Sequence, residues 1–553
     1  MLSRFPLDVR FSLRAALFGA SLLLPAAALA ADMPKGDKTE KLGADKSDAP
    51  KSRFKPESHS SDGSVTIGGR AIAYQAVAGT LVVHPKGWDD VPKAEKEDGA
   101  KDDGDDDHGP TAEASMFYVA YFAKGAPAEG RPVTFLFNGG PGSSTVWLHM
   151  GAFGPRRVVT ADDTHTPAAP YQLVSNEQSL LDATDLVFVD APGAGFSRIA
   201  GKDKEKSFWG IDADAHAFSE FITGFLSKYG RWNSPKYIFG ESYGTTRSAV
   251  VANMLQSEYD VDLNGVILLS QIFSFDTSVD GPETNPGIDV AYPLALPTYA
   301  ATAWYHHKLG GAQRDLPGLM AEVEKFAMTD YTLALAAGAT LPADRREAIA
   351  AKLHDYTGLP VAYIKKANLR ISGGEFEKNL QDDTDTTTGR LDTRFSGPTM
   401  DPLSKEADYD PQSAAISSAY VSTFNDYARR VLHYGEGTAY KPEINVFPWW
   451  DMQHQPPGAE NKLPQSANVM PDIAAALKMN PNLKIQLNGG YFDLATPFFE
   501  GIYEMQHLQI PPKLQANIEF KQYESGHMVY AHQASLQQLH DNVAGFIART
   551  HGR

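Results

Sequence analysis

Short, continuously apolar segments recur along much of the chain, separated by longer segments of mixed polarity. The apolar segments have the length and the β-branched or aromatic content of buried strands. Between two of them, from Phe218 to Tyr229, apolar residues recur at helical spacing and form one apolar face. Strands that alternate with helices predict a mostly parallel sheet with helices on both sides. The predicted strands are 133–137, 185–190, 237–239, 265–269, 483–488 and 517–523.

The alternation of strands and helices stops between residues 272 and 479. This segment has many Pro and Gly residues, several helical patterns and few strand signals. We therefore predict a large, mainly helical cap inserted between two parts of one α/β core, 64–271 and 480–553. Two aromatic clusters in the cap either line a substrate pocket or pack the cap on the core. They comprise Tyr299, Trp304 and Tyr305, and Phe447, Trp449 and Trp450.

The N-terminal residues 1–30 have the pattern of a secretory signal peptide. Three arginines precede an apolar stretch that ends in Ala28-Leu29-Ala30, so cleavage near Ala30 is predicted. A membrane anchor is the alternative, but Arg14 and Pro25 leave too short an apolar run to span a bilayer comfortably. We expect an exported, soluble protein without a membrane anchor, either periplasmic or secreted.

Composition narrows the functional classes. The 553-residue chain has a formal net charge of −18, which leaves no bulk basic surface and argues against a nucleic-acid partner. It has no cysteine, so thiol nucleophiles, thiolate metal sites and disulfides are excluded. Residues 31–63 are polar and predict a disordered leader. Residues 89–113 are strongly acidic and predict a solvated loop, because Asp102–Asp107 lacks the ligand spacing of a calcium loop. No metal or organic cofactor is expected.

The sequence Gly240-Glu241-Ser242-Tyr243-Gly244 lies between a predicted strand and a predicted helix at 245–255. Gly-x-Ser-x-Gly in this context predicts a nucleophile elbow, whose serine hydroxyl is exposed at a helix N-terminus. The two glycines permit a turn that side chains would obstruct. An ordinary strand-to-helix turn is the alternative. The rest of the chain must therefore supply a base, an orienting carboxylate and oxyanion donors.

Asp493 and His527 each follow a predicted strand of the second part of the core. With Ser242 they occur in the order Ser, Asp, His, which is the order and placement of the α/β-hydrolase fold. His527 can accept the serine proton, and Asp493 can orient the imidazole ring and stabilise its charged form. His454 and His532 are competing bases, but neither follows a strand at the functional edge of the sheet.

A glycine-rich loop, Asn138-Gly139-Gly140-Pro141-Gly142, directly follows the predicted strand 133–137. Glycines at this position allow backbone N–H groups to approach a substrate that side chains would block. We predict that the N–H groups of Gly140 and Tyr243 form an oxyanion hole. A plain tight turn is the weaker alternative.

Four motifs together resemble the serine carboxypeptidases: Asn138–Ser144, Asp190–Phe196, Gly240–Gly244 and Gly526–Val529. The resemblance implies an α/β-hydrolase fold and removal of C-terminal residues from peptides through an acyl-enzyme. It implies Ser242, Asp493 and His527 as the triad. It also implies that Asn138 and Glu241 bind the terminal carboxylate of the substrate. That use of Glu241 requires its protonated form, which fits a preference for acidic pH.

The chain departs from this family pattern at several positions. Ala152 stands where the family often has a second glutamate, and Ser143 and Thr496 stand where cysteines are usual. Ser270-Gln271-Ile272 replaces a Gly-Asn-Gly stretch. These departures leave an esterase or acyltransferase as an alternative. A non-catalytic binding protein is less favoured, because all triad residue types are retained. Nothing in the pattern indicates an oligomeric state.

Overall fold

The computed structural model describes residues 52–88, 111–125, 127–310, 314–463 and 466–551. They belong to one compact unit that runs from Ser52 to Arg553. The predicted signal peptide (1–30), most of the predicted leader (31–63) and nearly all of the acidic loop (89–113) lie outside the described residues.

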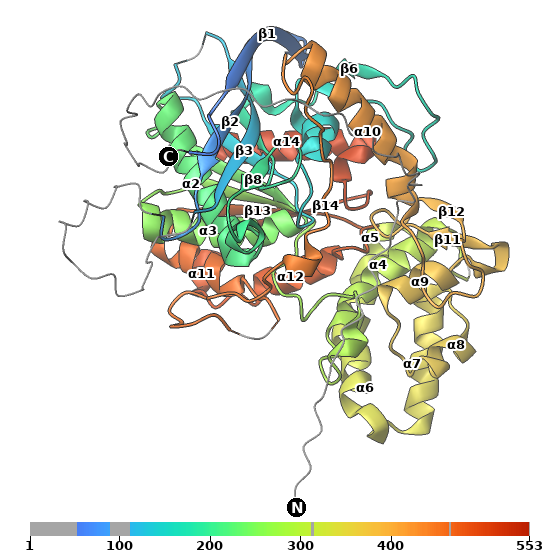
Figure 1. Ribbon diagram of the computed structural model, residues 1–553. Coiled ribbons are helices and arrows are strands. Elements are labelled where there is room, and N and C mark those ends of the chain that lie inside the picture. The colour runs from blue at the N-terminus through green and yellow to red at the C-terminus, as the bar shows by residue number, and fades with distance from the viewer. Residues whose placement is uncertain (1–51, 89–110, 126, 311–313, 464–465, 552–553) are drawn as a thin grey trace, which may run out of the picture. The chain divides into compact units, whose positions relative to one another are not determined.

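A large sheet forms the centre of this unit (Figure 1). Its strand order is β1-β2-β3-β7-β4-β9-β10-β13-β14, with β8 paired to β3. From β7 to β14 all neighbours are parallel, and the first three strands are antiparallel. This is the α/β-hydrolase fold, as predicted. The strands are β1 (Ser58–Ile67), β2 (Arg70–Val83), β3 (Glu113–Ala123), β4 (Val133–Phe137), β7 (Asp185–Val189), β8 (Arg198–Ala200), β9 (Lys236–Glu241), β10 (Gly265–Leu269), β13 (Lys484–Gly490) and β14 (Ile518–Tyr523).

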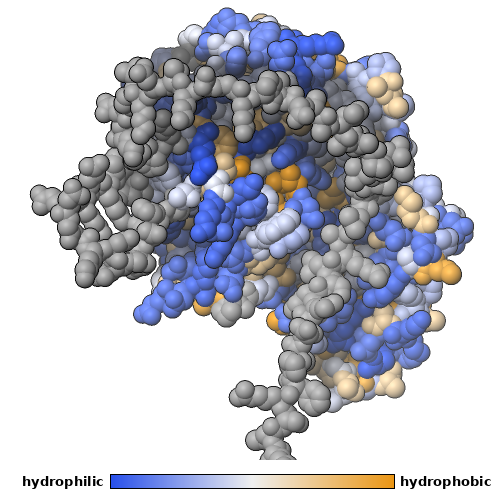
Figure 2. Space-filling view, in the orientation of Figure 1, coloured by the Kyte–Doolittle hydropathy of each residue, from blue (hydrophilic) through white to orange (hydrophobic). Residues whose placement is uncertain are grey.

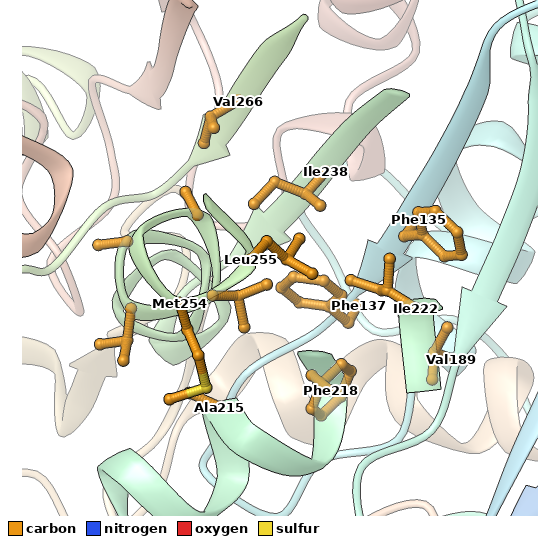
Figure 3. Close-up of a cluster of buried hydrophobic side chains, with 14 of the residues drawn as sticks. Phe135, Phe137, Val189, Ala215, Phe218, Ile222, Ile238, Met254, Leu255 and Val266 are labelled. Atoms are coloured by element: carbon orange, nitrogen blue, oxygen red, sulfur yellow. The ribbon is translucent and has the colours of Figure 1, made fainter. Parts of the chain in front are cut away.

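Helices bury both faces of the sheet, which explains the continuous apolar strands. Helices α2 (Ile211–Tyr229), α3 (Tyr243–Tyr259) and α11 (Met470–Met479) contribute to the hydrophobic cluster on one face. On that face Phe137 of β4 lies close to Phe218 of α2 and Leu255 of α3 (Figure 3), and Phe135 packs against Phe225 of α2. Leu136, between them on β4, belongs to the second cluster with α10 (Pro411–Arg430) and α14 (Gln533–Thr550). Short helices α1 (Lys204–Phe208), α12 (Phe498–Gln506) and α13 (Pro512–Gln515), and the paired strands β5 (Arg156–Val158) and β6 (Leu173–Ser175), complete the core.

The N-terminal hairpin differs from the prediction at its boundaries. β1 begins at Ser58, before the predicted start of the core at Ser64, and pairs along its whole length with β2. The segment 70–83 forms one long strand. Glu113, predicted as the end of the acidic loop, is the first residue of β3. Its buried carboxylate accepts a hydrogen bond from the backbone N–H of Arg53 at 2.6 Å, which ties the chain start to the sheet.

The segment predicted as a single cap at 272–479 consists of two structural parts. Helices α4 to α9 have their own hydrophobic cluster, which Phe492, Leu494 and Phe498 of the core complete. By contrast, α10 and α11 pack into the two main clusters of the sheet. The first part comprises α4 (Ala291–Tyr305), α5 (Leu316–Phe326), α6 (Thr332–Ala337), α7 (Ala343–Thr357), α8 (Val361–Lys366) and α9 (Gly373–Asn379), followed by the strand pair β11 (Thr386–Thr388) and β12 (Ser396–Pro398) (Figure 1).

Hydrophilic residues predominate among the coloured atoms of the face in Figure 2, and the hydrophobic ones are scattered between them. Among the described residues, no helix is long and apolar enough to cross a membrane. Within the same residues, no group of three or more His, Asp or Glu side chains is arranged to hold a metal ion.

Candidate active site

Ser242 occupies a sharp turn between β9 and α3. Its backbone has φ +61° and ψ −132°, a conformation that residues with a side chain rarely adopt. The flanking glycines are required by space. A Cβ atom at Gly240 would overlap the carbonyl oxygen of Gly244, and one at Gly244 would lie 2.8 Å from the carbonyl oxygen of Phe137. This is the geometry of a nucleophile elbow, with the serine at the N-terminus of a 17-residue helix.

His527 and Asp493 are hydrogen-bonded to each other, with 2.9 Å between His527 Nδ1 and Asp493 Oδ2. Both side chains are buried. Asp493 Oδ1 accepts the backbone N–H groups of Ala495 and Thr496 at 3.0 Å each, and Thr496 Oγ1 donates to Oδ2 at 2.9 Å. Burial disfavours a charged imidazole, but the carboxylate of Asp493 outweighs it and raises the pKa of His527. The pair is therefore built to hold a proton on His527.

Ser242 and His527 line one pocket of about 180 Å³. Among the hydrogen bonds of the described residues none joins Ser242 Oγ to His527, so the transfer of a proton requires these groups to approach when substrate binds. Of the predicted site residues, only Asp493 and Tyr243 are not part of the lining; Asp493 is hydrogen-bonded to His527, and Tyr243 directly follows Ser242. Its lining is Asn138, Gly139, Gly140, Ser143, Trp147, Glu241, Ser242, Arg390, Leu391, Ser413, Ile416, Ser417, Glu443, His527 and Met528.

The loop after β4 lies directly against the elbow. A Cβ atom at Gly139 would overlap the backbone nitrogen of Tyr243, so only glycine permits this approach. Gly140 has φ +108° and lines the pocket beside Ser242. Arg247 of α3 fixes the position of the loop, because its Nη1 donates a hydrogen bond to the carbonyl oxygen of Asn138 at 2.8 Å. Its Nε donates to the buried carboxylate of Asp214 at 2.6 Å. The backbones of the loop and of the elbow are thus in direct contact beside Ser242.

Glu241 is held by Tyr530, a residue that the sequence analysis missed. The Tyr530 hydroxyl lies 2.8 Å from Glu241 Oε2 and 3.1 Å from Oε1, and both side chains are buried. Asn138 Oδ1 accepts the backbone N–H of Leu148 at 3.1 Å, which orients its amide in the pocket. Burial raises the pKa of Glu241 to about 7, against the lowering effects of His527, Tyr530 and Asn138. Its position one residue after Gly-His-Met-Val is the signal that could have identified Tyr530.

Residue Ala152, where the family pattern often has a glutamate, is buried in a helical turn at 148–153. The other departures take polar roles at the site. Ser270 Oγ donates to the carbonyl oxygen of His527 at 2.8 Å, and Ser143 Oγ accepts from Trp147 Nε1 at 2.9 Å. Thr496 Oγ1 donates a hydrogen bond to Asp493. Hydroxyl groups therefore stabilise the loop that carries His527 and the loop that carries Asp493.

A turn of the inserted segment, residues 389–395, also holds the base and was missed by the sequence analysis. The carbonyl oxygen of Leu391 accepts the backbone N–H of His527 at 2.6 Å, and Asp392 Oδ2 accepts that of Gly526 at 3.2 Å. Thr393 donates to the carbonyl oxygen of Phe492, next to Asp493, at 2.9 Å. One turn therefore fixes the loops of both His527 and Asp493. It has no apolar periodicity, so nothing in the sequence pattern marks it.

The competing histidines lie outside the pocket of Ser242. His454 bonds Asp212 at 2.5 Å and Asp472 at 2.7 Å, and these carboxylates raise its pKa to about 9 despite burial. His532 Nδ1 bonds Ser535 Oγ at 2.8 Å. The predicted aromatic clusters are not in the lining either. Trp304 and Tyr305 line a separate depression, and Trp450 packs edge-on against the Tyr243 ring.

One segment of the chain is similar to known proteins. Residues 106–281 match the family described as serine carboxypeptidase. A carboxypeptidase Y homologue from Arthroderma benhamiae is 29% identical over 179 residues, which cover 31% of this chain and 33% of the relative. The chain thus spans about a third of the length of this curated relative.

Solved structures give weaker likenesses. The match to proline iminopeptidase from Mycobacterium smegmatis includes 89% of this chain and 98% of the iminopeptidase chain. The sequence identity is 13% and the TM-score is 0.31. Monoglyceride lipase from Saccharomyces cerevisiae has 10% identity and a TM-score of 0.31. The match includes 80% of this chain and 93% of the lipase chain. The fold assignment rests on the strand order instead. The segment 106–281, which carries the predicted oxyanion loop and the elbow of Ser242, is similar to the serine carboxypeptidases, and this confirms the family resemblance of the three motifs that it contains.

Proposed function

We propose that this chain is an exported serine peptidase that removes C-terminal residues from peptides through an acyl-enzyme. One observation carries the proposal: the pocket that contains Ser242 and His527 also contains Asn138 and Glu241. A nucleophile and two groups able to bind a carboxylate therefore face the same small cavity. The similarity of residues 106–281 to serine carboxypeptidases supports it. Export rests on the signal-peptide pattern of residues 1–30.

In the acylation step, His527 Nε2 takes the proton of Ser242 as Oγ attacks the scissile carbonyl carbon. Asp493 stabilises the imidazolium through the 2.9 Å bond to Nδ1. The N–H groups of Gly140 and Tyr243 donate to the oxyanion, and each such donor is typically worth about 100- to 1000-fold in rate. The imidazolium then protonates the leaving amine. Water attacks the acyl-enzyme by the same route in reverse.

The carboxylate of the leaving residue is bound by Asn138 and by the protonated form of Glu241. With a pKa of about 7, Glu241 carries its proton in neutral to weakly acidic solution. Tyr530 replaces the missing second glutamate as the group that fixes the Glu241 carboxyl. The proposed peptidase therefore loses this mode of carboxylate binding as the pH rises through about 7.

Hydrolysis of an N-blocked dipeptide and of its C-terminally amidated form tests this function. We expect the amide to be cleaved at least ~100-fold more slowly, because the buried groups at Asn138 and Glu241 lose their partner. Glu241→Ala should reduce this ratio, and Glu436→Ala, an exposed glutamate outside the pocket, should preserve it. Equal cleavage of acid and amide would contradict carboxylate recognition. With ester cleavage retained, that result would favour an esterase or acyltransferase, the alternative that Ala152 leaves open.

A further inference from the structure

Glu443 lies on a segment that covers the oxyanion loop. Residues 442–444 run antiparallel to this loop, and Glu443 forms a bridge pair with Ser143. The backbone N–H of Ser144 donates to the carbonyl oxygen of Pro442 at 2.8 Å, and that of Ile444 donates to the carbonyl oxygen of Gly142 at 3.0 Å. The segment therefore has a fixed position, and it brings Glu443 to the wall of the pocket that contains Ser242.

In the part of the chain that the structure describes, the carboxylate of Glu443 has no counter-charge. Among the described residues, no Lys, Arg or His nitrogen lies within ion-pair distance of it, and no side chain donates a hydrogen bond to it. Arg390, the cationic side chain in the same lining, is paired with Asp280 through two hydrogen bonds. Glu443 is solvent-exposed where it lines the pocket, and the surrounding protein still raises its pKa. The pocket thus has one acidic wall without a cation.

We propose that Glu443 selects peptides with a basic side chain, Lys or Arg, next to the scissile bond. The proposal rests on the proposed peptidase function and names the substrate class for that site. A basic side chain in the pocket would supply the missing cation, and such charge complementarity favours one class of substrate over another. An acidic side chain there would face the carboxylate of Glu443, and like charges disfavour binding.

The test compares kcat/KM for blocked dipeptides that differ only in having Lys, Leu or Glu at the last or the penultimate position. For the wild-type protein we expect Lys to exceed Leu at one of the two positions and Glu to be the poorest residue there. Glu443→Gln keeps the shape and removes the charge. It should lower the Lys-to-Leu ratio by roughly 5-fold at that position. Glu436→Gln is the matched control and should keep the wild-type ratio.

Each outcome separates the inference from the function on which it depends. A Lys-to-Leu ratio that Glu443→Gln leaves unchanged overturns the role of Glu443 while the peptidase function stands. The same holds for a wild-type preference for Leu or Glu at both positions. If no peptide is cleaved although a fluorophosphonate labels Ser242, the peptidase function itself fails. Glu443→Lys adds an independent check, since it should make Glu better than Lys.

Discussion

Opposing effects determine the pKa of the Glu241 carboxyl group. Burial raises its pKa to about 7, and hydrogen bonds from Tyr530 and Asn138 act in the opposite direction. A donor that bonds a carboxylate favours the ionised form. The hydroxyl of Tyr530 therefore sets the pH at which Glu241 stops binding a carboxylate as a donor.

Tyr530→Phe should extend the activity on free-acid peptides to higher pH. Loss of the hydroxyl removes a stabilising donor from ionised Glu241, so the pKa of Glu241 rises further and its proton is retained longer. We expect the alkaline limb of kcat/KM to move up by about one pH unit, which corresponds to a hydrogen bond of about 1.4 kcal/mol. Kinetics on one dipeptide from pH 5 to 9 measure the shift.

The control for this prediction is Glu241→Gln, which cannot ionise and should lose that alkaline limb altogether. A limb that stays in place or moves to lower pH in Tyr530→Phe would show that Tyr530 does not control the charge of Glu241.

At the scale of elements, loops at the ends of strands carry the site, and a turn from the insertion supports them. Strand, glycine turn and helix form a local pattern, so the elbow after β9 and the loop after β4 could be predicted from the sequence. The turn at 389–395 could not, because its contacts with His527 and Phe492 are made across more than 90 positions of the chain. The role of Tyr530 was missed for the same reason, since its partner Glu241 is 289 positions away.

Gly526→Ala should weaken catalysis by displacing His527. A Cβ atom at Gly526 would lie 2.5 Å from the carbonyl oxygen of Leu391 and would overlap the Cβ atom of Asp392, so the loop must move away from the turn. Misplacing a catalytic group by about 1 Å can cost roughly 100-fold in rate. We expect a loss of that order in kcat, with KM little changed.

Steady-state kinetics and thermal unfolding of Gly526→Ala check this expectation. Gly130→Ala is the matched control, because no atom lies within 4 Å of its added methyl group. Wild-type kcat in Gly526→Ala would contradict the support of His527 by the turn.

At the scale of the whole molecule, helices from distant parts of the chain close over the sheet and are joined by buried charges. The α/β-hydrolase core could be predicted because its central strands β4, β7, β9 and β10 are buried on both faces and therefore nearly continuously apolar. The division of residues 272–479 into a separate helical part and two helices of the core could not be predicted. The reason is that the apolar faces of α10 and α11 have the same pattern as those of any cap helix. Only their packing shows that they cover the sheet. For the same reason, the sequence could not decide whether the aromatic clusters line a pocket or pack on the core. In the structure Trp450 packs against the ring of Tyr243 in the core.

His454 gives this packing a pH dependence. It lies between Asp212 at the start of α2 and Asp472 of α11, and its pKa is raised to about 9. A pKa raised on folding contributes stability that is complete below the unfolded value of about 6.5 and is lost as pH rises through about 9. The difference corresponds to about 3 kcal/mol at most.

His454→Gln should remove that dependence. In urea unfolding between pH 6 and 10, we expect the wild-type free energy of unfolding to fall across this range and the variant to be less stable at pH 6, with a flatter profile. His507→Gln serves as the control, because His507 is exposed and bonds only a backbone oxygen of its own helix. Parallel profiles for wild type and His454→Gln would contradict the assignment.

The central claim is that Ser242 is a nucleophile activated by His527 and Asp493. Intact-mass analysis after reaction with a fluorophosphonate tests it most directly, because the reagent forms a stable adduct only with an activated serine. We predict one adduct per chain on Ser242, none in Ser242→Ala, and labelling slowed by at least ~1000-fold in His527→Ala. Absence of an adduct on the folded wild-type protein, or equal labelling of Ser242→Ala, would contradict the account.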